Sequence, residues 1–199
     1  MADLEKTRKN LEGRGFRVHR FASGAEAAEF LVQTLHGTSI GIGGSGTIDT
    51  LGVYERLCGS NEVLWHWKNH APETRERAGK AETYLCSANG VSENGEIVNI
   101  DGFGNRVAGT IYGPERVFLV VGRNKIAPDL TGAIDRTRNI AAPLNARRLN
   151  RHTPCAVGEP RCHDCRSPEK ICGVMTVFFM PPTSIKEFHV ILVDEDLGY

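Results

Sequence analysis

The chain has 199 residues, which is long enough to bury a substantial core, and 40% of them are hydrophobic. Its 24 basic and 24 acidic residues give a formal net charge of zero, which argues against nucleic acid or an anionic membrane surface as a partner. The polar N-terminus and the absence of a long apolar run predict a cytoplasmic protein without a membrane span.

The first half of the chain alternates between predicted helices and strands. Strands are predicted over 16–21, 39–42, 63–67 and 84–86, and helices over 3–12, 23–35, 46–58 and 72–80. This alternation predicts an α/β fold with a mostly parallel sheet flanked by helices. Cys58 and Cys86 lie in apolar patterns, and we expect both side chains to be buried.

The second half begins with a predicted hairpin, because Asn94-Gly95 is a strong turn signal before an apolar run over 97–100. The remaining predicted elements are a strand buried on both faces over 117–121, helices over 130–140 and 144–149 separated by a break at Pro143, and strands over 174–180 and 185–193. We expect the two C-terminal strands to pair with each other in antiparallel fashion.

A glycine-rich turn between a predicted strand and a predicted helix is the first candidate binding site. Such a turn lets backbone N–H groups approach a carboxylate or phosphate. The candidate ligand-binding residues are Gly43, Gly44, Ser45, Gly46 and Thr47. The alternative is a tight structural turn.

Known nucleotide and nucleophile motifs fit this turn poorly. Residues 41–46 match G-x-G-x-x-G, but a dinucleotide site also needs an acidic residue after the next strand, where Lys68 follows Trp67. No Gly-Lys-Ser/Thr sequence completes a phosphate P-loop, and the turn does not form a G-x-S-x-G nucleophile elbow.

Two polar clusters follow predicted strands further along the chain. Asp101, Asn105 and Arg106 form the first, and Asn124 and Lys125 form the second. Loops beyond the carboxyl ends of parallel strands build ligand sites, so we expect both clusters to join the glycine turn around an anion. Asp101 and Lys125 are the candidate catalytic residues, with Asp101 as a general base. Alternatively, these side chains satisfy loop backbone groups.

A series of arginines in the C-terminal half is interpreted mainly as a solvated basic face, without the aromatic residues typical of nucleic-acid binding. Its members are Arg136, Arg138, Arg147, Arg148 and Arg151.

Four cysteines fall within 18 residues and predict a metal site, because structural disulfides are rare in the cytoplasm. The candidate ligands are Cys155, Cys162, Cys165 and Cys172. Four thiolates suit either tetrahedral zinc or an iron–sulfur cluster. A single Cys-x2-Cys unit with looser outer cysteines favours [4Fe–4S], whereas His152 and His163 keep zinc as the alternative.

The order and length of several motifs resemble the LUD domain family, which includes the lactate-utilisation proteins B and C. The matching segments are 42–47, 87–90, 95–106, 122–126, 141–145 and 194–199. The resemblance implies a NagB/RpiA/CoA-transferase-like sheet and one LUD-type domain over 1–199 with a metal-binding insertion at about 152–173. The motif Ser87-Ala-Asn89-Gly90 adds Asn89 to the implied ligand-binding residues.

The resemblance also implies a role in the oxidation of L-lactate, or a related 2-hydroxy acid, to pyruvate together with partner proteins. An alternative hypothesis is a non-catalytic ligand- or redox-sensing module whose four cysteines hold a structural metal. Acyl or CoA transfer is a weaker analogy, because the glycine turn offers no carboxylate nucleophile.

Overall fold

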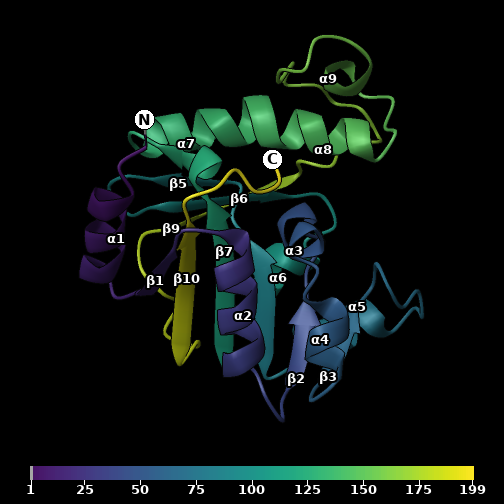
Figure 1. The fold of residues 1–199 in the computed structure, drawn as a ribbon. Coiled ribbons are helices and arrows are strands. Elements are labelled where there is room, and N and C mark those ends of the chain that lie inside the picture. Colours follow the sequence, from purple (N-terminus) through teal and green to yellow (C-terminus); the bar gives the residue numbers. More distant parts are fainter. Residues whose placement is uncertain (1) are drawn as a thin grey trace.

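A parallel sheet of six strands forms the centre of the computed structural model, which describes residues 2–199. The strands lie in the order β1-β10-β7-β4-β2-β3 (Figure 1). Their bounds are β1 Arg17–Phe21, β2 Ser39–Ile42, β3 Glu62–Trp65, β4 Thr83–Ser87, β7 Arg116–Gly122 and β10 Glu187–Val193. The predicted α/β class with a mostly parallel sheet is confirmed.

Helices surround the large sheet and the smaller sheet described below. Their bounds are α1 Leu4–Gly13, α2 Gly24–Thr34, α3 Gly46–Leu51, α4 Tyr54–Cys58, α5 Thr74–Gly79, α6 Asn105–Gly109, α7 Leu130–Arg136, α8 Ala142–Arg148 and α9 Pro154–Val157. The single helix predicted over 46–58 is wrong, since Gly52 adopts a left-handed conformation with φ 62° and ends α3. Cys58 is exposed at the end of α4, contrary to expectation, whereas Cys86 is buried as predicted.

The central strand β7 is buried on both faces, as its continuous apolar sequence predicts. Phe118 and Val120 join a core cluster on the side of α2, α3 and α4. Val117, Leu119 and Val121 join a second cluster that lies between the sheet, α1 and a smaller sheet. Side chains that alternate along one strand therefore connect the two halves of the core.

The smaller sheet has the order β8-β5-β6-β9. Its strands are β8 Ile126–Ala127, β5 Gly90–Ser92, β6 Ile97–Asp101 and β9 Val174–Phe178. The predicted hairpin is confirmed, because β5 and β6 pair in antiparallel fashion around Asn94-Gly95.

The two C-terminal strands lie in different sheets, contrary to the expected pair. Strand β9 pairs with β6 in antiparallel fashion, whereas β10 lies between β1 and β7, parallel to both. Residues 188–193 of β10 are buried, which suits the interior of the large sheet rather than an exposed edge. In Figure 1, β10 is the long yellow arrow within the large sheet.

The predicted break at Pro143 does not occur. Helices α7 and α8 are continuous through a π-helical turn, Thr137–Ala141, in which the N–H of Ala142 donates to the carbonyl of Thr137. A proline ring clashes with the carbonyl of the preceding turn of a regular helix, and a wider turn relieves that clash. Figure 1 shows the resulting α7–α8 helix lying across the ends of the parallel strands, with the α9 segment beyond it.

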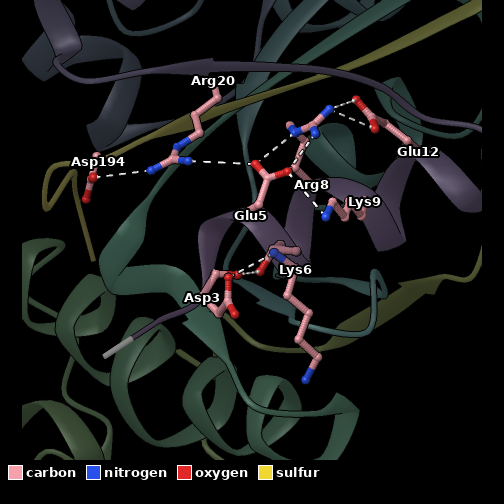
Figure 2. Close-up of polar contacts among 9 residues, drawn as sticks. Asp3, Glu5, Lys6, Arg8, Lys9, Glu12, Arg20 and Asp194 are labelled. Carbon is pink, nitrogen blue, oxygen red and sulfur yellow. Dashed lines mark hydrogen bonds and ion pairs between the residues drawn. The ribbon is translucent and has the colours of Figure 1, made fainter.

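Ion pairs join the exposed face of α1 to the edge of the large sheet (Figure 2). Arg8 lies 2.7 Å from Glu5 and 2.8 Å from Glu12, and Arg20 bridges Glu5 and Asp194 at 3.8 and 3.7 Å. Exposed pairs of this kind stabilise a fold little. The buried side chains of α1, Leu4, Thr7 and Leu11, face the core instead.

Helix α5 packs directly on strand β2 because residue 41 is a glycine. A Cβ on Gly41 would lie 2.0 Å from the carbonyl oxygen of Ala78.

Within residues 2–199, no helix is long and apolar enough to cross a membrane.

Candidate functional site

The glycine turn packs tightly between larger side chains at the carboxyl end of β2. A Cβ on Gly43 would lie 3.0 Å from both the Arg106 Cγ and the Tyr84 hydroxyl, and one on Gly44 would lie 3.4 Å from the Trp67 ring. The Ser45 hydroxyl accepts a hydrogen bond from a backbone N–H at the start of α3. Much of the turn's composition is therefore explained by packing and helix capping.

Lys125 is the most unusual side chain of the site. It is 3% exposed, and its Nζ donates to the Thr47 Oγ1 at 2.8 Å and the Ser87 Oγ at 2.7 Å. No carboxylate within residues 2–199 forms an ion pair with it. Burial lowers the pKa of the Lys125 ammonium to about 7, and the nearby cations of Arg136 and Arg106 contribute to the shift. A substantial fraction of the amine is neutral at pH 7.

Arg106 ties strand β4 to strand β6. Its Nη1 donates to the Ser87 carbonyl at 3.1 Å and the Asn99 Oδ1 at 2.7 Å, and its Nη2 donates to the Asn89 Oδ1 at 2.7 Å and the Ile100 carbonyl. These contacts occupy the terminal N–H groups that we expected to bind a ligand. Arg106 therefore supplies positive charge to the site while it holds the surrounding loops.

Asp101 is engaged in a similar way. Its carboxylate accepts backbone N–H groups from Phe103 at 3.1 Å, Arg106 at 2.9 Å and Val107 at 3.2 Å. These contacts shape the loop that leads into α6. Asn105, which begins that helix, lies beside Asp101 in the wall of the outer cavity described below.

Arg136 is buried, in contrast to the solvated face predicted for the arginine series. It donates to the main-chain oxygens of Asn124 at 2.7 Å, Asn89 at 2.5 Å and Tyr199 at 3.3 Å. Burial lowers the pKa of its guanidinium to about 10. The helical spacing could have indicated this burial, because Arg136 lies three residues after the apolar Ala133 and so on the same face of α7.

Asn124 faces the C-terminal tail. Its side chain donates to the Gly198 carbonyl at 3.2 Å and accepts the Leu197 N–H at 3.1 Å. It is absent from the linings of both cavities described next. Its place beside Lys125 in the sequence therefore does not bring it into the same cavity.

An inner cavity of about 60 Å³ brings together residues from several distant loops. Among the predicted residues it is lined by Gly44, Ser45, Gly46, Thr47, Asn89, Arg106 and Lys125. Sequence reasoning missed a second set of lining residues, namely Trp67, Ser87, Asn145, Arg148 and Tyr199. The Arg148 guanidinium lies 4.6 Å from the Trp67 ring centroid, in a cation–π contact that no local pattern predicts.

An outer cavity of about 400 Å³ continues from the inner one, with which it shares Gly44, Trp67, Arg106 and Arg148. Most of its charged residues are basic: Arg75, Arg106, Arg148, Arg151 and Lys170, against Asp101 and Glu169. The two cavities form one cleft whose positive charge suits an anionic ligand.

The four cysteines of the C-terminal segment line a third cavity, of about 330 Å³. Burial raises the pKa of the Cys172 thiol, and the positive charge of Lys170 acts in the opposite direction. Within residues 2–199, no group of three or more His, Cys, Asp or Glu side chains is placed to hold a metal ion. The metal site therefore stays a prediction.

The outer face of the long helix holds this segment. Arg138 donates to the Cys162 Sγ at 3.4 Å, and Asn139 accepts the Cys162 N–H at 2.9 Å. Of the two histidines, His163 lines the cysteine cavity, whereas His152 contacts Glu169 at 3.3 Å and is absent from its lining.

The cysteine cavity and the inner cavity share a wall. Ile100, Ala142 and Ile171 line both, and Ile171 directly precedes Cys172. The backbone of Ile171 packs against Gly102, where a Cβ would lie 2.7 Å from the Ile171 Cα. The cysteine segment therefore borders the cleft rather than projecting away from it.

The fold and cleft define an α/β protein whose basic pocket lies at the carboxyl ends of a parallel sheet. The sequence profile of the LUD domain matches residues 4–193, and the chain belongs to the LUD domain family, which is associated with lactate utilisation in general. A solved structure of a DUF162 family protein from Deinococcus radiodurans has the same fold, with a TM-score of 0.56 and 14% identity. That alignment covers 96% of this chain and 95% of the other. No curated protein matches significantly.

Proposed function

We propose that this protein acts in the oxidation of L-lactate, or of a related 2-hydroxy acid, to the 2-oxo acid, as one component of a multi-protein system. Its membership of a family associated with lactate utilisation supports this role. The observation that carries the proposal is the buried Lys125, whose Nζ contacts two hydroxyls and no carboxylate within residues 2–199. A ligand carboxylate would supply negative charge beside the Arg106 and Arg136 cations that surround this amine.

The inner cavity is small, about 60 Å³, so it would hold the carboxylate end of a ligand rather than a bulky group. The reacting end of a short acid fits such a space, and a larger substituent would extend into the outer cavity. Gly44, Gly46 and Thr47 of the glycine turn, with Asn89, would line the ligand.

Lys125 is the better candidate for proton transfer during the oxidation. Its neutral amine would accept the proton of the C2 hydroxyl, while the C2 hydrogen leaves with two electrons to an acceptor carried by a partner protein. Asp101 was the other candidate base, but its carboxylate already accepts three backbone N–H groups. We therefore assign Asp101 to positioning the loop that carries Asn105 and Arg106.

We also propose that Cys155, Cys162, Cys165 and Cys172 hold a [4Fe–4S] cluster, with Zn²⁺ as the alternative. Zinc needs four ligands about 2.3 Å from one ion, whereas a cluster holds its thiolates further apart. Four thiols that line one cavity of about 330 Å³, with a single Cys-x2-Cys unit among them, support the cluster. A bound cluster would supply a one-electron redox centre, and the shared wall would keep it beside the ligand.

Calorimetric titration with L-lactate and with pyruvate tests the ligand site. We expect binding by the unmodified protein and a 10- to 100-fold weaker affinity for Lys125→Met, about 1.4 to 3 kcal/mol, because a buried hydrogen-bond donor is lost from the pocket. The control is Lys9→Met, which removes an exposed lysine on α1. Equal affinities in all three proteins would contradict the proposal.

Iron, sulfide and zinc analysis of protein purified without oxygen tests the cysteine site. We expect about four irons and four sulfides per chain, and absorption at about 400 nm that dithionite bleaches. Cys162→Ser should lose this absorption, whereas Cys58→Ser, at an exposed thiol on α4, should keep it. About one zinc per chain would instead identify a structural site. Pyruvate binding without lactate-dependent reduction by the assembled partners would identify a sensing module.

A further inference from the structure

The hydrogen bonds around Lys125 can accommodate a neutral amine. An amine has two N–H groups, and Nζ contacts two oxygens, the Thr47 Oγ1 and the Ser87 Oγ. Each hydroxyl donates its own proton elsewhere, to the carbonyls of Leu197 at 3.4 Å and Ala88 at 3.2 Å, and so can accept from Nζ. In the neutral form of Lys125, both N–H groups of the amine then have partners, and the nitrogen lone pair has none.

The groups that face Lys125 favour this neutral state over the ammonium. Burial is the main reason that its pKa is lowered to about 7, followed by the positive charges of Arg136 on α7 and Arg106 on α6. The Cys86 thiol on β4 acts in the opposite direction, but burial raises its own pKa to about 12, so it is uncharged at neutral pH. A desolvated lysine beside other cations is the environment that activates amines as nucleophiles.

We propose that the Lys125 Nζ forms a covalent imine with the C2 carbonyl carbon of a small 2-oxo acid, with pyruvate as the simplest probe. This rests on the proposed function only for the assignment of the pocket to short carboxylates. Lys125 lines the inner cavity, whose small volume would hold the acid's C2 close to Nζ. The charges of Arg106 and Arg136 would attract its carboxylate.

The reaction conserves atoms and electrons without a further reagent. The nitrogen lone pair attacks C2 to give a carbinolamine, and the two amine protons leave with the carbonyl oxygen as water, so that a C=N bond replaces the C=O bond. Neither carbon nor nitrogen changes its oxidation state. The Ser87 and Thr47 hydroxyls contact Nζ and are placed to relay these protons.

Reduction by borohydride in the presence of pyruvate tests the imine, because it converts the C=N bond into a stable secondary amine. We expect intact-mass spectrometry to show one adduct, heavier by pyruvic acid less one oxygen atom, and peptide mapping to place it on Lys125. L-Lactate has no carbonyl group and should suppress labelling by competition without forming an adduct. Lys125→Met should give no adduct, whereas Lys9→Met should label like the unmodified protein.

The outcomes separate the imine from the binding site on which it rests. Pyruvate binding measured by calorimetry, without a mapped adduct on Lys125, would overturn the imine and leave the proposed function standing. Equal labelling of surface lysines would overturn it as well. The absence of pyruvate binding would overturn both. Peptide mapping of the adduct on the unmodified protein tests the imine at Lys125 even if Lys125→Met fails to fold.

Discussion

A buried lysine with only hydroxyl partners gives the stability of the fold a pH dependence of defined sign. The pKa of Lys125 is about 7 in the folded protein, below its ordinary value of 10.5. Between these two values the unfolded chain binds a proton that the folded chain does not, so stability rises with pH. Below pH 7 both states are protonated and the full destabilisation is present; above pH 10.5 it is absent.

Lys125→Met should remove this dependence. We expect the unfolding free energy of the unmodified protein, measured relative to the variant in urea, to rise by about 2 kcal/mol between pH 7 and pH 9. Taking the difference cancels the titration of other groups that behave alike in both proteins. A difference that stays constant over this range would show that the buried amine is not depressed in pKa.

Residue types in the sequence indicated where polar groups gather, but not which way each of them points. The expectation that the glycine turn and two later clusters share one site fits the positions of Thr47, Arg106 and Lys125 around the inner cavity. Nothing in the sequence distinguishes Lys125 from its neighbour Asn124, which turns to the C-terminal tail. Those directions depend on tertiary contacts, which local patterns do not contain.

At the scale of elements, the contact of α5 with β2 depends on one missing side chain. A Cβ at Gly41 would overlap the Ala78 backbone, which cannot rotate away as a side chain can. We expect Gly41→Ala to lower the unfolding free energy by about 3 kcal/mol, because helix and strand must separate. Denaturant unfolding monitored by circular dichroism measures the change.

Gly79→Ala is the matched control, because it adds the same methyl group to α5. A Cβ there has no atom within 4 Å, and alanine favours a helix more than glycine does. We expect this variant to be neutral or slightly more stable. Similar losses in both variants would attribute the effect of Gly41→Ala to something other than the helix–strand contact.

The elements themselves were predictable where local signals agree. The apolar run in β7 and the Asn94-Gly95 turn each imply one structure, and both predictions are confirmed. The break expected at Pro143 was wrong, because the π turn Thr137–Ala141 accommodates the ring. Such a turn depends on the packing of the whole helix on the smaller sheet, and the sequence rule for proline does not include it.

At the scale of the whole molecule, a net charge of zero conceals an uneven distribution. The cleft collects Arg106, Lys125, Arg148 and other cations from segments distant in sequence, whereas many carboxylates lie in exposed pairs such as those of α1. Composition gives the net charge of the chain but not the separation of cations in the cleft from carboxylates elsewhere on the surface. The arrangement of the C-terminal strands was equally hidden, since the choice between two sheets depends on contacts with distant strands.

The long helix α7–α8 lines the cleft with Asn145 and Arg148 and contacts the cysteine segment through Arg138 and Asn139. One continuous helix therefore contacts both the cleft and the cysteine segment. A ligand in the cleft and a group in the cysteine cavity would influence each other if both favoured the same position of this helix. Thermodynamic reciprocity requires the effect to be equal in both directions. Under that condition, a change in the loading of the cysteine segment would change the affinity of the cleft, and ligand binding in the cleft would change the loading by the same factor.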